Sequence, residues 1–330
     1  MESAFTFLET GSTDPYYNLA FEEYVLTHRR EGNYLILWQN DNTIVIGLNQ
    51  NTEAEINRPF VEEHGIRVVR RTTGGGAVYH DLGNLNYSFI TDTENADAVA
   101  KEQFTRPILD ALRSLGVNAS ASGRNDILAE GRKVSGTAQR IDHGRVLHHG
   151  TLLFDSDPSA VEGALKVDPE KFRAKGIQSV RMRIGNIRPL LKTDMTISAF
   201  RDYLLQFLTK GNAGAGALSG EELKEVLALR DSKYSTWEWN YGRSPALEMH
   251  KKKRFPAGTV EIHLSVRHGI IREIRIFGDF LALSPLTPLL EALRDTPYRK
   301  EDVLTAIRDV PFAACLGGGS AEEFVSVLFE

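Results

Sequence analysis

Apolar and polar residues alternate along this chain with two different periods. Near the start, Asp14-Pro15 is typical of a helix beginning, because a carboxylate caps the first turn and proline suits its first position. The apolar residues that follow at helical spacing are Tyr17, Ala20, Phe21, Tyr24 and Val25. Two β-branched, apolar runs come next, at 34–38 and 43–47, and the turn-forming residues between them predict a β-hairpin.

The middle of the chain mixes strand-like runs with helices. The expected strands are 68–70, 87–90, 127–128, 133–139 and 146–154. The expected helices are 104–115, 198–208 and 221–230. The last of these helices follows a capping box formed by Ser219 and Glu222. This mixture predicts an α/β (α+β) fold, in which helices flank a mixed β-sheet.

A change of pattern divides the chain of 330 residues, which is longer than one typical core. Residues 246–256 are polar and basic, so we expect a linker there. Beyond them, strict alternation from Val260 to Val266 predicts a half-buried strand, and a second strand at 270–277 and three short helices follow. We therefore expect a large domain over 1–245 and a small α+β domain over 257–330.

Composition narrows the classes of protein that this chain can represent. No apolar run approaches 18 residues, so no membrane span is expected, and the N-terminus lacks the pattern of a signal peptide. The single cysteine excludes an internal disulfide and fits a reducing, cytoplasmic location. The net charge of −5 argues against a dedicated nucleic-acid-binding protein.

The most unusual segment is the glycine triplet at 74–76, which follows Arg70 and Arg71. Consecutive glycines let a backbone approach a ligand closely and leave amide groups open to anions, and arginines suit phosphate. The segment matches neither the dinucleotide fingerprint nor the P-loop. A mobile surface turn would explain a glycine triplet alone, but the arginines and flanking strands favour a ligand cradle.

Two later segments carry further candidate side chains. Asn125 and Asp126 precede an apolar run, where a turn is their ordinary role. Lys133 lies in a run of small and apolar residues, so its ammonium group needs a partner such as a carboxylate or a phosphate. His148 and His149 are adjacent on an expected strand and so point to opposite faces, which argues against a shared zinc ion. These features indicate an anion-binding enzyme.

Six segments resemble, in order and in spacing, the motifs of the lipoate–protein ligase family, a branch of the wider group that includes biotin ligases and octanoyltransferases. They are NLAFEE at 18–23, GLNQN at 47–51, RRTTGGGAVYHDLGN at 70–84, GRNDI at 123–127, KVSGTAQR at 133–140 and HHGTLLF at 148–154. WEWNYG at 237–242 and GDF at 278–280 are similar to the family's inter-domain and accessory-domain motifs. The resemblance therefore covers nearly the whole chain, and it implies a biotin/lipoate-ligase-like catalytic domain with an accessory domain.

The resemblance implies a two-step reaction in which ATP activates lipoate to lipoyl-AMP and a carrier lysine then takes the lipoyl group. Lys133 would be catalytic, bridging the lipoate carboxylate and the α-phosphate. The residues implied for ATP are Arg71, Gly76, Ala77, Val78, Tyr79, Asn125 and Asp126. The residues implied for lipoate are Arg70, Gly75, His80, Lys133, His149 and Thr151. Asp126 is also the implied Mg²⁺ contact, since this ion prefers carboxylate and phosphate oxygens.

The implied partners are lipoyl domains of 2-oxoacid dehydrogenase acyltransferase subunits and the glycine-cleavage carrier protein, with the ligase itself a monomer. The basic segment 166–188 could steer such a carrier or be a plain solvated loop. Two alternatives stay open: an octanoyl or lipoyl transferase that works without ATP, and a non-catalytic protein that binds lipoyl carriers. A cysteine-dependent transferase would need Cys315, for which a small buried side chain is the more ordinary role.

Overall fold

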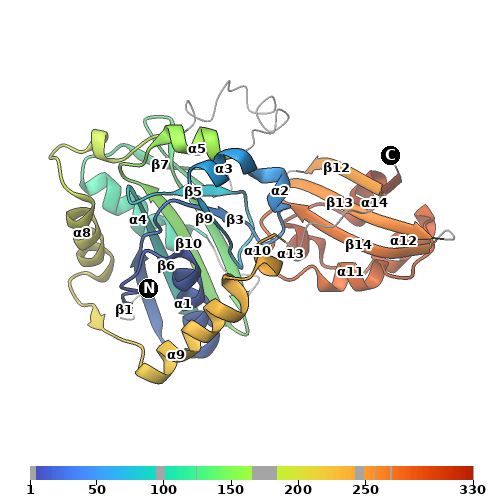
Figure 1. Ribbon diagram of the computed structural model, residues 1–330, viewed down its shortest axis with the longest axis horizontal. Coiled ribbons are helices and arrows are strands. Elements are labelled where there is room, and N and C mark those ends of the chain that lie inside the picture. Colours follow the sequence, from blue (N-terminus) through green and yellow to red (C-terminus); the bar gives the residue numbers. More distant parts are fainter. Residues whose placement is uncertain are drawn as a thin grey trace. The chain divides into compact units, whose positions relative to one another are not determined.

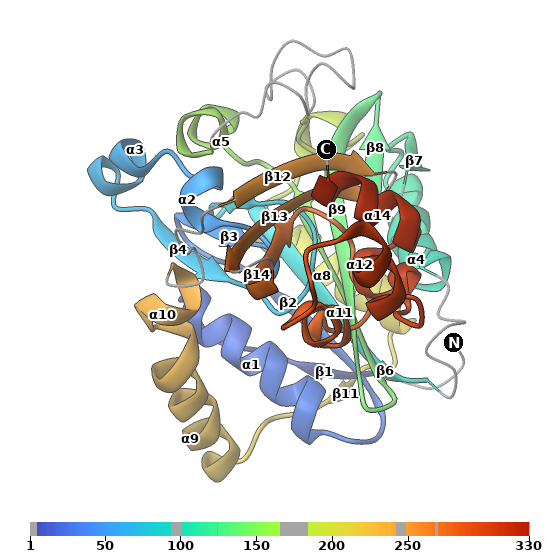
Figure 2. The same ribbon diagram turned by 90° about the vertical axis from the view of Figure 1, so that its right-hand side faces the viewer.

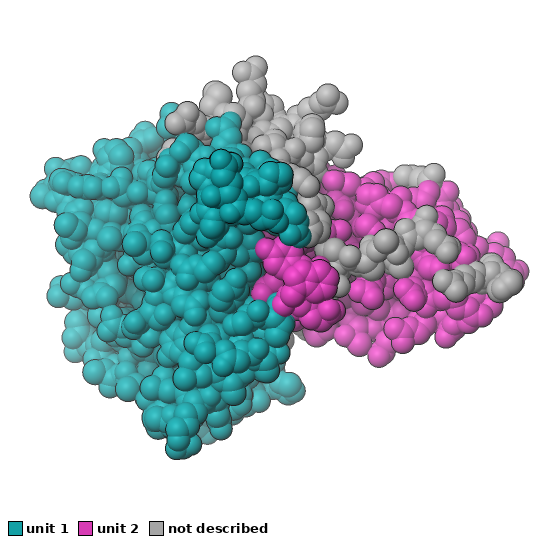
Figure 3. Space-filling model, viewed as in Figure 1, with its two compact units in different colours: residues 1–45, 55–69, 78–236 teal, residues 46–54, 70–77, 237–330 magenta. Residues whose placement is uncertain are grey.

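The computed structural model describes residues 5–93, 101–123, 125–165, 184–241, 249–255, 257–267 and 270–329. The chain forms two compact units, which are coloured separately in Figure 3. Unit 1 consists of Met1–Val45, Glu55–Val69 and Val78–Thr236. Unit 2 consists of Ile46–Ala54, Arg70–Ala77 and Trp237–Glu330. Two short segments of the expected 1–245 domain thus belong to the same unit as the C-terminal part of the chain.

Unit 1 is built on a mixed sheet of eight strands in the order β11-β1-β2-β6-β10-β9-β8-β7 (Figure 1). The strands are β1 (Phe5–Leu8), β2 (Asn33–Trp38), β6 (Asn84–Asp92), β7 (Ala119–Ser122), β8 (Asp126–Ala129), β9 (Arg132–Asp142), β10 (Arg145–Leu153) and β11 (Gly214–Ala215). β1 runs parallel to β2 and β11, and every other neighbouring pair is antiparallel. The predicted strands at 127–128, 133–139 and 146–154 are confirmed as members of one sheet.

Helices cover both faces of this sheet. On one face α4 (Glu102–Ser114) and α8 (Ile197–Thr209) complete a core that includes Phe89, Phe104 and Phe200. On the other face α1 (Pro15–His28) lies beside α9 (Gly220–Leu229), which leads into η3 (Arg230–Tyr234), as Figure 2 shows. Helices α5 (Pro158–Ala164) and η2 (Arg188–Leu190) also belong to this unit.

Helix α1 is buried around most of its circumference, including the polar residues Asn18, Glu22 and Glu23. The predicted cap is confirmed, because the Asp14 side chain accepts a hydrogen bond from the Tyr16 N–H at 3.1 Å. The predicted box at α9 is also confirmed, with Ser219 and Glu222 bonding each other's backbone N–H groups. No helix among the described residues is long and apolar enough to cross a membrane.

A second, smaller sheet has the order β4-β3-β5, with β3 (Thr43–Ile46) between β4 (Arg67–Arg70) and β5 (Val78–His80). The predicted hairpin of 34–38 with 43–47 is therefore wrong, because β2 pairs with β1 and β6 of the large sheet instead. The turn-forming residues between β2 and β3 carry the chain from one sheet to the other. Helices α2 (Thr52–Glu55) and α3 (Arg58–Glu63) connect β3 to β4.

Unit 2 contains an antiparallel sheet of β12 (Met249–Phe255), β13 (Gly258–Arg267) and β14 (Ile270–Gly278). Most of the expected linker at 246–256 is therefore strand β12, whose alternation the sequence hides because lysine stems fill its half-buried positions. Four helices follow rather than three: α11 (Thr287–Leu293), α12 (Lys300–Ala306), α13 (Phe312–Leu316) and α14 (Ala321–Phe329). They form one apolar core with the sheet, and α10 (Trp237–Asn240) also belongs to this unit.

Candidate active site

The Lys133 ammonium group has a carboxylate partner in unit 1. Its Nζ lies 2.8 Å from Oδ1 of Asp126, and the two side chains are 26% and 19% exposed. Lys133 lies on β9 and Asp126 at the first position of β8. The expected partner of Lys133 is therefore Asp126, a residue that was predicted separately to contact ATP and Mg²⁺. Because both groups are partly exposed, an anion or a cation from solution can reach the pair.

An irregular pairing of the strands brings these two side chains together. The register of β8 and β9 shifts between Ile127 and Leu128, which is the mark of a β-bulge. Gly136 then leaves room for the lysine: a Cβ at this position would lie 2.9 Å from Nζ of Lys133. The Lys133 carbonyl accepts a hydrogen bond from the Gly185 N–H at 2.9 Å, which holds the bulged strand from its other side.

Two further predicted residues lie beside this pair. The Gly136 N–H donates to Oγ1 of Thr151 on β10 at 3.2 Å. The Asn125 side-chain amide donates to the Thr137 carbonyl at 3.2 Å, and the Thr137 N–H donates back to the Asn125 carbonyl at 2.8 Å. The structure thus brings Asp126, Lys133 and Thr151 together on three adjacent strands, with Asn125 in the turn immediately before Asp126. Arg124, which belongs to the same sequence motif, lies outside the described residues.

His149 lies on the face of the sheet that α1 covers. Its Nδ1 is 2.9 Å from Oε1 of Glu22, and the same oxygen accepts a hydrogen bond from Ser88 Oγ, which itself accepts one from Trp38 Nε1. His148 points to the opposite face, where its ring stacks on Phe104 at 4.9 Å. The predicted opposite orientation of the two histidines is confirmed by these contacts.

Burial lowers the pKa of His148 to about 3, and the charges of His149 and Lys101 act in the same direction. Neither ring nitrogen of His148 has a hydrogen-bond partner among the described residues. The imidazole is therefore neutral at physiological pH and acts as an aromatic side chain in the core between α4 and the sheet.

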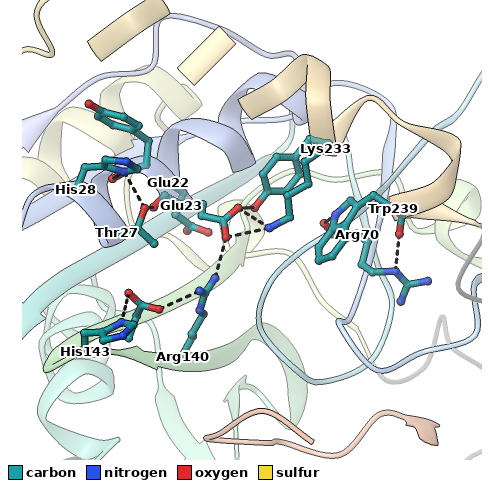
Figure 4. A network of polar contacts seen from close by, with 12 residues as sticks. Glu22, Glu23, Thr27, His28, Arg70, Arg140, His143, Lys233 and Trp239 are labelled. Carbon is teal, nitrogen blue, oxygen red and sulfur yellow. Dashed lines mark hydrogen bonds and ion pairs between the residues drawn. The ribbon is translucent and has the colours of Figure 1, made fainter. Parts of the chain in front are cut away.

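Glu23 is the centre of a charged cluster on the same face as Glu22 (Figure 4). Its carboxylate accepts hydrogen bonds from Arg140 at 3.0 Å, Lys233 at 2.7 Å and the Tyr234 hydroxyl at 2.8 Å. Burial by itself would raise the pKa of Glu23, but Lys233, Tyr234 and Arg140 together lower it. The same arrangement raises the pKa of Tyr234, through its burial and the charge of Glu23.

Sequence reasoning missed Glu22, Glu23 and Lys233 as members of a polar network. The sequence did contain one signal: Glu22 and Glu23 are adjacent in a helix, and the three residues on either side of the pair are apolar or aromatic. A buried carboxylate requires a positive or hydrogen-bonding partner. The pair could therefore have been flagged, whereas the identity of the partners, about 120 and 210 residues away, depends on the tertiary fold.

Tyr79 and His80 occupy β5, a strand that the sequence analysis does not predict. The Tyr79 hydroxyl donates to Oδ1 of Asn42 at 3.0 Å, and burial followed by the nearby aspartates raises the pKa of Tyr79 to about 12. His80 is 3% exposed, with Nδ1 3.2 Å from the Asn40 side-chain amide and its ring edge-on to Trp38. Val78 begins this strand in unit 1, whereas Ala77 is the last residue of a unit 2 segment.

Arg70 is fully buried in unit 2 and is surrounded by hydrogen-bond acceptors. All three guanidinium nitrogens donate: Nε to the Trp239 carbonyl, and Nη2 to Oγ1 of Thr52 at 2.6 Å. Nη1 donates to the backbone carbonyls of Gly47, Leu48 and Gln50 at 2.9, 3.2 and 2.7 Å. Arg70 therefore ties the 47–52 segment to the α10 segment, a role that the sequence does not predict.

Arg71 holds the glycine triplet from within. Its Nη2 donates to the carbonyls of Gly74 and Gly76 at 2.7 and 2.9 Å, and its side chain is largely buried. The Gly75 N–H donates to the Phe280 carbonyl at 3.2 Å, so the expectation of an amide open to anions is wrong for Gly75. Gly75 has φ +95°, and a Cβ on Gly74 would lie 2.7 Å from the Phe280 oxygen. These glycines let two backbone segments of unit 2 meet.

Cys315 lies on α13 in the core of unit 2, with no exposed surface. Its Sγ donates to the Pro285 carbonyl at 3.5 Å. The expectation of a small buried side chain is confirmed. Because an acyl-transfer nucleophile must reach its substrate, this burial argues against the cysteine-dependent transferase.

Comparisons with known proteins agree with this geometry. Residues 14–209 match the lipoyl protein ligase A/B catalytic domain, and residues 244–328 match the bacterial lipoate protein ligase C-terminus. Lipoate-protein ligase LplJ of Bacillus subtilis is 41% identical and lipoate–protein ligase 1 of Staphylococcus aureus 40% identical, each over 96% of this chain and 97% of the relative.

Three solved structures are also similar. P. falciparum LipL1 in complex with lipoate has a TM-score of 0.79 and 26% identity, over 93% of this chain and 94% of its own. A bipartite ligase from Thermoplasma acidophilum, studied with its E2 lipoyl domain, has a TM-score of 0.64 and 30% identity, over 76% of this chain and 99% of its own. Lipoate-protein ligase A bound with ATP has a TM-score of 0.61 and 28% identity, over 73% of this chain and 99% of its own. With a catalytic-domain match over more than half of its length and relatives this similar from end to end, the chain belongs to the lipoate–protein ligase family of enzymes.

Proposed function

We propose that this enzyme activates lipoate with ATP and then transfers the lipoyl group to a lysine of a carrier domain. The observation that carries the proposal is the Lys133–Asp126 pair, a partly exposed ammonium and carboxylate 2.8 Å apart in a catalytic domain of this family. Relatives solved with lipoate and with ATP support these two substrates.

In the first step, a lipoate carboxylate oxygen attacks the α-phosphorus of ATP. The bond between that phosphorus and the bridging oxygen of the β-phosphate breaks, and pyrophosphate leaves. Two anions must approach each other, so the main barrier is electrostatic. The Lys133 ammonium would turn from Asp126 to the meeting oxygens and neutralise both. In the second step, the carrier's amine attacks the lipoyl carbonyl and AMP leaves.

Asp126 suits the Mg²⁺ that accompanies ATP. Its carboxylate is a hard oxygen ligand and is reachable from solvent, and Mg²⁺ is commonly held by one or two carboxylates with phosphate oxygens and water. Such an ion would neutralise phosphate charge when bound. When the Lys133–Asp126 ion pair opens, the Asp126 carboxylate would gain Mg²⁺ as its positive partner. The Lys133 ammonium would gain the carboxylate and phosphate oxygens of the substrates as its negative partners. Asn125 offers its side-chain oxygen from the turn immediately before Asp126.

The remaining predicted contacts have unequal support from the geometry. Arg71, Gly76, Ala77, Val78 and Tyr79 are proposed for ATP, and Arg70, Gly75, His80, His149 and Thr151 for lipoate. Thr151 lies on β10, next to the strand that carries Lys133, and this position supports its proposed contact with lipoate. Arg70 and Arg71 already make many hydrogen bonds to backbone carbonyls, which supports a role in holding the 47–52 and 74–76 segments in place.

The proposed acceptors are lipoyl domains of 2-oxoacid dehydrogenase acyltransferase subunits and the glycine-cleavage carrier protein. The similar Thermoplasma ligase was studied with its E2 lipoyl domain, which supports the first class. Most of the basic segment 166–188, considered above for docking, lies outside the described residues. A monomer in the cytoplasm is the expected setting.

The experiment is pyrophosphate release by the full chain with ATP and lipoate, followed by lipoylation of an apo lipoyl domain. Lys133→Ala should lose about 10²–10³-fold in pyrophosphate release, the usual effect of removing one electrostatic group from an active site. Lys224→Ala, at an exposed lysine paired with Glu221 on α9, is the matched control and should keep full activity. Normal release by a folded Lys133→Ala variant would overturn the mechanism. Absence of pyrophosphate release by the unmodified chain would overturn the proposed activation step and favour either the transferase that works without ATP or the non-catalytic protein that binds lipoyl carriers.

A further inference from the structure

One face of the unit 2 sheet carries a cluster of side chains able to bind a metal ion, which the proposed ligase reaction does not use. His250, Glu261 and His263 each offer a ligand atom, and these atoms all lie within 4.8 Å of one another. No other group of three such residues is this close among the described parts of the chain. All three belong to unit 2, on β12 and β13.

The strand register fixes this juxtaposition. His250 of β12 is directly opposite His263 of β13, and Lys252 is directly opposite Glu261. Side chains two residues apart lie on the same face of a strand, so all four share one face. Ile262 and Leu264, whose alternate position sends them to the other face, are fully buried in the core. The cluster is therefore held by a sheet rather than by a loop.

The geometry needs little change to accept an ion. Nε2 of His250 is 3.6 Å from Oε2 of Glu261, and the imidazoles of His250 and His263 have centroids 4.6 Å apart. A tetrahedral ion with bonds of about 2.0–2.2 Å needs ligand atoms roughly 3.4 Å apart. The ligand atoms of the three side chains are at most 4.8 Å apart, and rotation of the side chains can shorten this separation to about 3.4 Å without moving the strands.

Nε2 of His263 is buried and has no hydrogen-bond partner among the described residues. The two oxygens of Glu261 have separate partners, with Oε1 2.9 Å from Nζ of Lys252 and Oε2 facing His250. A cation at the histidines would therefore meet Oε2 while Lys252 keeps Oε1.

We propose that His250, Glu261 and His263 form a binding site for a divalent transition metal of the zinc class, joining β12 to β13. Two imidazole nitrogens and one carboxylate oxygen suit Zn²⁺, Co²⁺ or Ni²⁺, whereas Mg²⁺ and Ca²⁺ prefer oxygen alone. Lys252 and Arg275, which is opposite His263 on β14, are positive and oppose a cation. They moderate the affinity, and the site differs in both place and chemistry from the Mg²⁺ proposed at Asp126.

The test is binding of Zn²⁺ to the full chain, measured by calorimetric titration and by the retention of metal after dialysis. The unmodified chain should bind Zn²⁺ at this site and should unfold at a higher temperature with Zn²⁺ than with a chelator, whereas excess Mg²⁺ should not compete. The His250→Ala/His263→Ala double variant should lose the binding and the temperature shift. Removing an outer partner of a metal site costs roughly 10–100-fold in affinity, so the loss of two ligands should exceed that range. His143→Ala, at an exposed histidine of unit 1, is the control and should bind as before.

Two further arms keep the result decisive. Lys252→Met should tighten Zn²⁺ binding, since it removes the positive charge that competes for Glu261. In the unmodified chain, Zn²⁺ should shift the imidazole NMR signals of His250 and His263 before that of His143, a readout that does not depend on a variant's folding. Undiminished binding by the double variant, or signals of His250 and His263 that do not move, would refute the site.

Discussion

Lys133 and Arg70 are both positively charged residues on β-strands, but they differ in burial and in the kind of partner. Lys133 lies on β9 of the large sheet in unit 1, whereas Arg70 ends β4 of the small sheet and belongs to unit 2. Lys133 has a carboxylate partner 2.8 Å away and a side chain that is 26% exposed. Arg70 is fully buried and donates to several backbone carbonyls, which carry partial rather than full negative charge. A cation that can leave its partner can serve a substrate, whereas one that pairs many carbonyls links chain segments together.

Arg70→Met would test this contrast with the largest expected effect on stability. It removes the Nη1 donor from the carbonyls of Gly47, Leu48 and Gln50. The Gly47 carbonyl keeps the Gln50 N–H as a donor at 3.1 Å, but the acceptors that are left unpaired together cost about 3–5 kcal/mol. The free energy of unfolding, from urea titration, is the measurement. Lys133→Met is the matched comparison and should lose no more than about 1 kcal/mol, because its ion pair is partly exposed. Equal losses in the two variants would remove the distinction.

A second prediction concerns His148, whose neutral ring is buried in unit 1. Its pKa is lowered to about 3 in the folded chain, below the ordinary value of 6.5. The unfolded state therefore binds more protons, and stability falls as the pH drops from 6.5 towards 3. At pH 5 this histidine should account for a loss of about 2 kcal/mol. His148→Phe should remove that part of the acid dependence, seen by comparing unfolding at pH 7.5 and pH 5.

The glycine triplet gives a third, smaller effect. Gly75 has φ +95°, and a Cβ there would lie 2.9 Å from Nη2 of Arg71, so Gly75→Ala should cost about 1–2 kcal/mol. At Gly76 the nearest atom to an added Cβ is 3.9 Å away, so Gly76→Ala should change stability by less than about 0.5 kcal/mol. The measurement is the thermal midpoint of unfolding of the two variants, which should be lower for Gly75→Ala than for Gly76→Ala. If both variants are equally stable, backbone packing within unit 2 is not the reason for glycine at position 75.

Cys315→Ser has the smallest expected effect. The side chain is buried in the core of unit 2, whereas Lys133 and Asp126 belong to unit 1, so pyrophosphate release and lipoyl transfer should be unchanged. Burying a hydroxyl in place of a thiol should cost about 1 kcal/mol, seen as a modest fall in the thermal midpoint. A folded variant without lipoyl transfer would favour the cysteine-dependent transferase instead.

Local patterns were sufficient to predict most single elements. The cap at Asp14, the box at Ser219 and the alternation from Val260 to Val266 depend on residues within a few positions of each other, and all are present. The need of Lys133 for a partner was also readable, because an ammonium group among small and apolar residues cannot stay unpaired at low cost. Resemblance to family motifs then predicted the family, which the relatives confirm.

Pairing over long distances was decided by the tertiary structure alone. The runs at 34–38 and 43–47 look like a hairpin, but β2 finds better partners in β1 and β6, and β3 joins β4 and β5 instead. The partners of Glu23 come from β9 and η3, and those of Arg70 from the 47–52 and 239–240 segments. The membership of 46–54 and 70–77 in unit 2 rests on backbone contacts that glycine allows, such as Gly75 with Phe280. Sequence periodicity determines which face of an element is buried, but the partner that covers it depends on shape and on unpaired polar groups elsewhere in the chain.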